Sequence, residues 1–192
     1  MTRIPVHKRS LDIEIFDDEQ GFTVLGHLTD RRPWHDDPSR QVLHDMTIEL
    51  GIDPATLTIT SATSQMSAFP HAECPLVTMR FGNLVGLSVG RGYSKALRDV
   101  FGGVTGCAHV YELARTAGAA VVQGNLSRQA KKAHDTGTVR NIDPDRLKAM
   151  MAGTCHVWAV DGVAPAKLDL GWRPAGVFPV PSLEQLRDQQ GS

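Results

Sequence analysis

Residues 42–51 alternate apolar and polar side chains, and no other stretch limits the fold of this chain as strongly. Successive side chains of a β-strand point to opposite faces of a sheet, so this segment would bury one face and expose the other. His44 falls on the apolar face of the expected strand, and Asp45 falls on the polar face. The pattern therefore predicts a half-buried strand with a histidine on its buried side.

Neighbouring segments extend this strand into a sheet. Residues 11–16 and 22–28 are rich in apolar side chains and flank a polar turn that ends in Gly21, as in a β-hairpin. After the alternating strand, an Asp-Pro turn leads into residues 57–62, which form the last predicted strand of the sheet. The first third of the chain is therefore predicted to form an antiparallel β-meander.

Helical patterns dominate the rest of the chain. Ser94 is a suitable N-cap for a short helix that ends at Phe101, and a longer helix with one apolar stripe is expected over residues 105–123. Another short helix is expected over residues 144–151, and a last strand over residues 155–160.

The predicted fold class is thus α+β, an antiparallel β-meander followed by helices packed on one face. We expect a single domain over residues 1–165 and a Pro-rich C-terminal extension over residues 166–192. The exposed edges of the sheet and the apolar residues 172–180 also predict a homodimer.

Charge and composition exclude several classes of partner. A net charge of -1 over 192 residues gives no electrostatic reason for binding nucleic acid or an anionic membrane. No segment has the apolar length of a membrane span, and the N-terminus lacks the apolar core of a signal peptide. We therefore expect a cytoplasmic protein whose three cysteines are reduced and whose partner is a small molecule.

Cys107 and His109 lie two residues apart where a glycine-rich turn enters the second predicted helix. The free N–H groups and the dipole of a helix start stabilise a thiolate or a bound anion. Two interpretations remain open: a reactive pair, or a small buried cysteine beside an ordinary histidine. Glu112, three residues after His109, would either orient the imidazole or form a weak surface pair with it.

This segment resembles the hallmark of the bacterial domain-of-unknown-function family 2889, which is Gly-Cys-Thr-His-Leu followed shortly by Glu-Leu. Ala108 stands where that family usually has Thr, and Val110 stands where it usually has Leu. The resemblance covers roughly residues 10–160 and is specific as a set. Further pieces match the family pattern in order: Leu28-Thr29-Asp30 with Pro33, His44-Asp45-Met46, Cys74-Pro75, Leu84-Val85-Gly86-Leu87 with Gly92-Tyr93, and Cys155-His156.

The resemblance implies an enzyme of bacterial aromatic catabolism, because we associate this family with bacteria that degrade lignin-derived phenols. The most concrete form of this expectation is a carbon–carbon lyase. A base would remove a hydroxyl proton, the bond would break to release formaldehyde or a similar small carbonyl, and the electrons would flow into a phenolic ring. No cofactor is expected, since the sequence lacks the fingerprints of phosphate loops and of nicotinamide binding.

Acid–base chemistry of this kind needs side chains that exchange protons near neutral pH. The candidate catalytic residues are His44, Asp45 and His109. The candidate substrate-binding residues are polar or aromatic groups near the predicted strand ends and glycine-rich turns: Asp30, Trp34, Arg91 and Tyr93. A solvated loop and an ordinary surface arginine are the alternative interpretations of this second set.

A metal-binding or iron–sulfur-handling protein is the alternative function. A strand meander followed by helices, with Asp45 in the third strand and cysteines further on, is similar to iron–sulfur scaffold proteins of the IscU type. If the topology is shared, its mixed sulfur, nitrogen and oxygen ligands would suit zinc or iron. The ligands would then be Asp45, Cys74 and Cys107, with His109 or His44. Spacing alone supports no metal site, because the sequence contains no Cys-x-x-Cys and no His-x-x-x-His.

A ligand-binding module without catalysis is a third possibility.

Overall fold

The computed structural model describes residues 3–18, 21–90, 92–138, 142–173 and 179–190. The chain divides into two compact units, residues 1–129 and residues 130–192. The first unit contains the sheet and the helices that cover it, and the second unit contains short helices.

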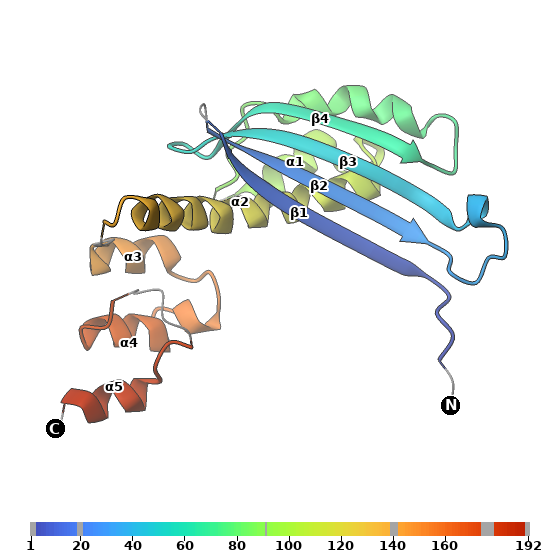
Figure 1. Cartoon of the computed structure of the whole chain (residues 1–192). Coiled ribbons are helices and arrows are strands. Elements are labelled where there is room, and N and C mark those ends of the chain that lie inside the picture. Colours follow the sequence, from blue (N-terminus) through green and yellow to red (C-terminus); the bar gives the residue numbers. More distant parts are fainter. Residues whose placement is uncertain (1–2, 19–20, 91, 139–141, 174–178, 191–192) are drawn as a thin grey trace. The chain divides into compact units, whose positions relative to one another are not determined.

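Four long strands form the sheet of the first unit (Figure 1). They are β1 (Lys8–Asp18), β2 (Gly21–Arg31), β3 (Val42–Asp53) and β4 (Thr58–Ala68). Each strand pairs antiparallel with the next one in the sequence, so the spatial order is β1-β2-β3-β4. The predicted α+β class and its β-meander are confirmed.

Helices cover one face of this sheet and leave the other face open (Figure 1). The covering helices are α1 (Tyr93–Phe101) and α2 (Ala108–Asp135), and a 3₁₀ helix over Cys74–Leu84 runs beside β4. Apolar side chains of β2 and β3 alternate inward toward these helices and join the buried side chains of α1 and α2 in one core. The alternation predicted for residues 42–51 is observed, because one side of β3 is buried and the other is not.

Helix α2 begins near the predicted start but continues twelve residues beyond the predicted end at residue 123, to Asp135. Its second half loses the apolar stripe, yet it is rich in residues of high helix propensity such as Ala, Gln, Lys and Arg. Lys132 and His134 in the last turn favour the helix by interacting with the negative end of its dipole. Intrinsic propensity thus extends this helix beyond the part that a buried stripe predicts.

The second unit contains α3 (Pro144–Met151), α4 (Val163–Asp169) and α5 (Leu183–Gln190). Helix α3 has the predicted bounds, but the last strand predicted over residues 155–160 is wrong. That segment instead holds a 3₁₀ turn over His156–Trp158, with local backbone hydrogen bonds such as Trp158 N–H to the Cys155 carbonyl at 3.0 Å. Turn hydrogen bonds satisfy backbone groups that a strand would have to pair with a neighbouring strand. Among the described helices, none is long and apolar enough to cross a membrane.

Candidate active site

Asp30 near the end of β2 and His44 near the start of β3 lie opposite each other in the sheet register. Both side chains point to the face that the helices cover. Only 1% of Asp30 and 8% of His44 is exposed, and among the described residues these are the only polar or charged side chains that are buried. Charged groups are rarely buried without partners. The hydrogen-bond partners of Asp30 and His44 therefore indicate which chemistry the site can support.

Four hydrogen bonds reach the Asp30 carboxylate. Arg9 donates from Nε to Oδ1 and from Nη2 to Oδ2, both at 2.7 Å, which is a bidentate pair. His44 Nδ1 lies 2.9 Å from Oδ2, and His7 Nε2 lies 3.1 Å from Oδ1. The hydrogen bonds from Arg9, and then from His44, hold the pKa of Asp30 well below its usual range against the opposing effect of burial. Asp30 is therefore a permanent carboxylate that accepts hydrogen bonds and does not exchange protons near neutral pH.

This carboxylate fixes the tautomer of His44. Because Asp30 is ionised, the Nδ1 atom of His44 must donate the hydrogen bond that joins them, as assigned from the contact geometry. The other ring nitrogen, Nε2, then carries a lone pair and can accept a proton. A buried carboxylate behind a histidine is the arrangement that orients a general base and stabilises the imidazolium formed after proton transfer.

His109, from the first turn of α2, lies against the ring of His44. The two ring centroids are 3.8 Å apart with an angle of 32° between the planes. Nε2 of His109 is 3.5 Å from Oδ2 of Asp30, and Nδ1 is 3.8 Å from the Cys107 sulfur. Burial, and then the neighbouring His44 and Arg9, lower the pKa of His109. The site thus pairs a histidine that is bonded to a carboxylate with a second histidine whose pKa is lowered.

Arg9 joins three elements at the site. Besides its two bonds to Asp30, it donates from Nη1 to Glu112 Oε2 of α2 at 2.7 Å. Glu112 therefore contacts the guanidinium, whereas the sequence had suggested that it orients His109. Arg9 lies on the inward face of β1 with the apolar side chains of Leu11 and Ile13, which the register places on alternate positions. A charged residue at an inward position of an amphipathic strand is the signal that could have revealed Arg9, and the sequence analysis missed it along with His7.

The outer side chains of the site are partly exposed to solvent, whereas the inner ones are buried. The side chain of Asp30 is 1% exposed and that of His44 is 10% exposed, whereas those of His109, Arg9 and Glu112 are 25%, 34% and 37% exposed. Exposure thus rises from the carboxylate outward through the histidines. A molecule arriving from solvent would meet His109 and the edge of His44 before it reached Asp30.

Asp45, which the sequence suggested as a third catalytic residue, lies on the opposite face of the sheet. Adjacent strand residues point to opposite faces, so Asp45 cannot share the face of His44. Its Oδ1 atom is 3.0 Å from Nε2 of His27, a half-exposed histidine of β2. The structure brings His44, His109 and Asp30 together and separates Asp45 from them.

The remaining candidate substrate residues are scattered. Tyr93 is buried in the core and donates from its hydroxyl to the Ala114 carbonyl at 3.1 Å, and burial raises its pKa. Trp34 is 54% exposed and lies beside the ring of His35, at a centroid distance of 5.4 Å. Arg91 lies outside the described residues. Only Asp30 of this set reaches the histidine pair in a contact that the structure shows.

The three cysteines have different surroundings. Cys107 contacts His109, Cys74 is half-buried against the core, and Cys155 is exposed in the second unit. The ligand set expected for a metal, with Asp45 and Cys107, is divided between the two sides of the sheet. Within the part of the chain that the structure describes, the three metal-ligating side chains that converge are Asp30, His44 and His109, whose ligand atoms lie within 4.8 Å of one another.

The geometry of this group is compatible with an ion, but its electrostatics favours protons. The separations of 2.9 Å and 3.5 Å from Asp30 Oδ2 to the two imidazole nitrogens resemble those between ligands that each lie about 2.0–2.2 Å from one metal. Arg9, however, already donates to both oxygens of the carboxylate. An ion here would lie beside a guanidinium, and repulsion between like charges would weaken its binding.

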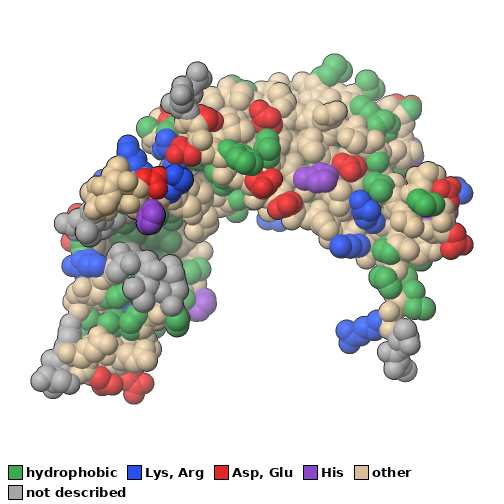
Figure 2. All heavy atoms as spheres, viewed as in Figure 1, with side chains coloured by type: hydrophobic (Ala, Val, Ile, Leu, Met, Phe, Trp, Pro, Cys, Tyr) green, Lys and Arg blue, Asp and Glu red, His purple; other side chains and the backbone are tan. Residues whose placement is uncertain are grey.

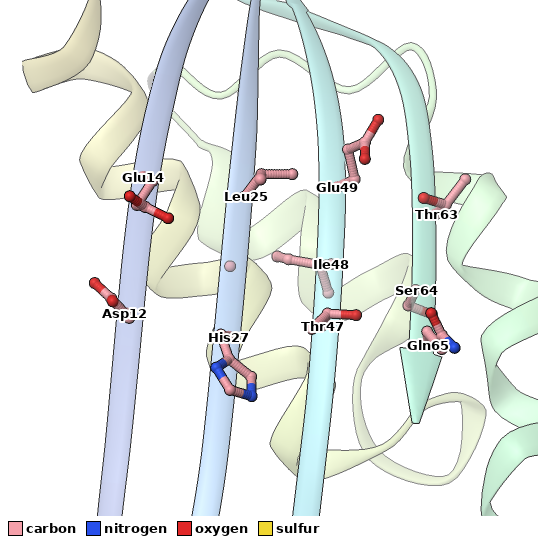
Figure 3. A pocket seen from close by; sticks show the side chains of 11 residues that line it. Asp12, Glu14, Leu25, His27, Thr47, Ile48, Glu49, Thr63, Ser64 and Gln65 are labelled. Atoms are coloured by element: carbon pink, nitrogen blue, oxygen red, sulfur yellow. The ribbon is translucent and has the colours of Figure 1, made fainter. Parts of the chain in front are cut away.

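The open face of the sheet carries a wide hollow of about 640 Å³ that is separate from this site (Figure 3). Figure 2 shows the same face, where carboxylates and a histidine lie over the strands. The polar side chains that point from the strands into the hollow include Asp12, Glu14, His27, Glu49 and Gln65. Solvent reaches these groups freely, so this surface lacks the burial that sets Asp30 and His44 apart.

The lowered pKa of His109 predicts a dependence of stability on pH. An unfolded histidine gains its proton near pH 6.5, whereas folded His109 gains it only at lower pH. Between these two values the unfolded state binds more protons, so the free energy of unfolding falls as the pH falls. Urea unfolding at about pH 7 and about pH 5.5 should show this loss in the wild type and a smaller loss in His109→Gln. The exposed His134 provides the control, and equal losses in the wild type, His134→Gln and His109→Gln would contradict the prediction.

Comparison with known proteins identifies the family. The family model described as "Protein of unknown function (DUF2889)" matches residues 7–123, which include every residue of the site from His7 to Glu112. No curated protein and no solved structure matches the chain. The matched region covers more than half of the sequence and confirms the family that the sequence resembles. The chain therefore belongs to the DUF2889 family.

Proposed function

We propose that the protein is a small-molecule lyase that breaks a carbon–carbon bond by acid–base catalysis, with His44 as the base. The observation that carries this proposal is the buried hydrogen bond of 2.9 Å between Asp30 and His44. It leaves one nitrogen of His44 unprotonated and places a carboxylate where the imidazolium needs a negative partner. The proposed location of the enzyme is the cytoplasm.

The reaction follows from these roles. Nε2 of His44 removes the proton of a hydroxymethyl group, the oxygen forms a carbonyl, and the adjacent carbon–carbon bond breaks to release formaldehyde. The bonding electrons pass into a conjugated phenolic ring, and the proton held on His44 returns to the product. The substrate thus exchanges a hydroxymethyl group for hydrogen, so the step needs no oxidant and no cofactor.

The charges of the site favour a neutral phenolic substrate. Arg9 is the cation that the described residues place at the site, and two carboxylates, Asp30 and Glu112, already neutralise it. A carboxylate or phosphate substrate would therefore meet a net negative charge. Neutral His109 can form a hydrogen bond with a phenolic oxygen, and the paired imidazole rings can stack with an aromatic ring. The lignin-derived origin of the phenol is proposed from the family resemblance.

Formaldehyde release from phenolic compounds with a hydroxymethyl side chain tests the proposal. His44→Gln should lower kcat/KM by about 10²–10⁴-fold, because it removes the base. His27→Gln is the matched control, since His27 is also paired with an aspartate but lies on the open face. Equal activity of His44→Gln and the control would contradict the assignment, and a folded wild-type protein that releases no carbonyl from any member of the phenol series would contradict the lyase.

Metal binding is the second candidate function, favoured by the three ligand atoms within 4.8 Å at Asp30, His44 and His109. Mass spectrometry of the purified, tag-free protein distinguishes the two functions. About one zinc or iron per chain that is lost in His44→Gln would favour the metal site. A folded protein without metal that releases formaldehyde would favour acid–base catalysis.

A further inference from the structure

The proposed lyase mechanism does not use Cys107, although this thiol contacts one member of the histidine pair. Its sulfur lies 3.8 Å from Nδ1 of His109, within hydrogen-bond distance for sulfur. The other nitrogen of the same ring, Nε2, lies 3.5 Å from the Asp30 carboxylate. A negative charge beside Nε2 favours the proton on that nitrogen, so the lone pair on Nδ1 faces the thiol. The imidazole of His109 thus contacts a nucleophile through one nitrogen and a carboxylate through the other, which is the general arrangement of an activated nucleophile.

Cys107 also stands immediately before a long helix. Its carbonyl accepts the N–H of Tyr111 at 2.8 Å, at the start of the hydrogen bonding of α2. The N–H groups of the first helical turn have no carbonyl of the same helix before them, and they carry the positive end of the helix dipole. They are suited to stabilise a negative oxygen that develops next to the sulfur. A nucleophile, a base and oxyanion donors are together what addition to a carbonyl group needs.

We propose that Cys107 is a covalent binding site for small aldehydes, which it holds as a reversible hemithioacetal. The sulfur forms a bond to the carbonyl carbon, and the π electrons of the carbonyl move to its oxygen. His109 takes the thiol proton on Nδ1 and delivers it to that oxygen. All atoms are conserved, and the step needs no oxidant or reductant. The proposal rests on the proposed function only for the source of the aldehyde, since a lyase of this kind would release formaldehyde beside the thiol.

The other two cysteines serve as internal controls for this proposal. Cys155 is exposed, so a reagent limited only by access would modify it first. Cys74, like Cys107, is partly buried, and it packs against the core. Higher reactivity at Cys107 than at Cys155 would therefore reflect activation by neighbours and not accessibility.

Alkylation by iodoacetamide, followed at each cysteine by peptide mass spectrometry, tests the proposal in the full-length protein. Cys107 should react about tenfold or more faster than Cys155. Added formaldehyde should slow alkylation at Cys107 reversibly and leave the rate at Cys155 nearly unchanged. A slower reaction at Cys107 than at Cys155, or equal slowing of both by formaldehyde, would overturn the proposal.

Two variants make the test specific. His109→Gln should remove the advantage of Cys107 and its protection by formaldehyde while leaving Cys155 as an unchanged reference. If this variant fails to fold, the slowing of Cys107 alkylation by formaldehyde in the wild type is the measurement that tests the proposal. Cys107→Ser separates this proposal from the lyase, because it should lose the aldehyde adduct but keep turnover through His44. Aldehyde protection in a protein without lyase activity would reject the proposed function and support the thiol site.

Discussion

Asp30→Asn is expected to lower the free energy of unfolding by about 3 kcal/mol, because the buried carboxylate that accepts hydrogen bonds from Arg9 and His44 is replaced by an amide that cannot satisfy all of these donors. Arg9 would keep Glu112 as its charged partner, and the amide would present an N–H₂ group to donors that now point at a carboxylate. Chemical denaturation measures this loss. Asp12→Asn is the matched control, since Asp12 is an exposed strand aspartate on the open face, and it should change stability by less than about 0.5 kcal/mol.

The same substitution should lower kcat/KM for formaldehyde release by about 10³–10⁴-fold, since His44 would lose both its orientation and the charge that stabilises its imidazolium. A parallel assay of Asp45→Asn decides between the two aspartates that the sequence and the structure suggest. Turnover that depends on Asp45 and not on Asp30 would show that the reaction takes place on the open face of the sheet, and the assignment of the site would be wrong.

The stability of Asp30→Asn should also depend differently on acid. In the wild type, the pKa of Asp30 lies below its unfolded value, so the unfolded chain binds a proton first as the pH falls below about 4. The stabilisation contributed by the ionised carboxylate is therefore complete near neutral pH and is lost as the pH approaches the pKa of the folded state. The asparagine variant lacks this part of the acid dependence.

The alternation of β3 explains both what the sequence predicted about the site and what it missed. The period of two residues placed His44 on the buried face and Asp45 on the exposed face, and both placements are observed. The same alternation argues against placing His44 and Asp45 in one site, because adjacent strand residues point to opposite faces. The carboxylate partner of His44 comes instead from the strand beside it, at the position that the register sets opposite. The pattern within one strand predicts which face a residue occupies, but not which residue of the next strand it meets.

A contact between two segments far apart in the sequence completes the site for a similar reason. Arg9 lies at the start of β1 and Glu112 lies in α2, and their ion pair exists only because the helix packs over the end of that strand. No local pattern encodes such a contact. Local patterns predicted the meander and the start of α2 well, since each depends on periodicity, glycines and turns within a few residues. The prediction of a strand over residues 155–160 failed because it also relied on a local pattern. A short apolar run forms a strand only where a partner strand is present.

Gly118→Ala is expected to destabilise the protein by about 2–3 kcal/mol, although alanine favours helices over glycine by roughly 1 kcal/mol. Gly118 is buried in α2, and a Cβ atom there would lie 2.1 Å from Cε1 and 2.5 Å from Cδ1 of Tyr93. The ring cannot turn aside freely, because it is buried and its hydroxyl is bonded to the Ala114 carbonyl. Helix α1 would have to move away from α2, and the packing of the helical layer over the sheet would loosen.

Gly124→Ala, in the same helix, is the matched control for this clash. A Cβ atom at residue 124 would also come within 2.1 Å of another atom, but that atom is the terminal Cδ1 of Ile15, a half-exposed side chain of β1 that can change rotamer. The gain in helix propensity should then make this variant neutral or slightly more stable. Thermal unfolding compares the two substitutions directly. A similar melting temperature for both variants would mean that the contact between Gly118 and Tyr93 does not limit how closely α1 and α2 pack, whereas a selective loss in Gly118→Ala would show that it does.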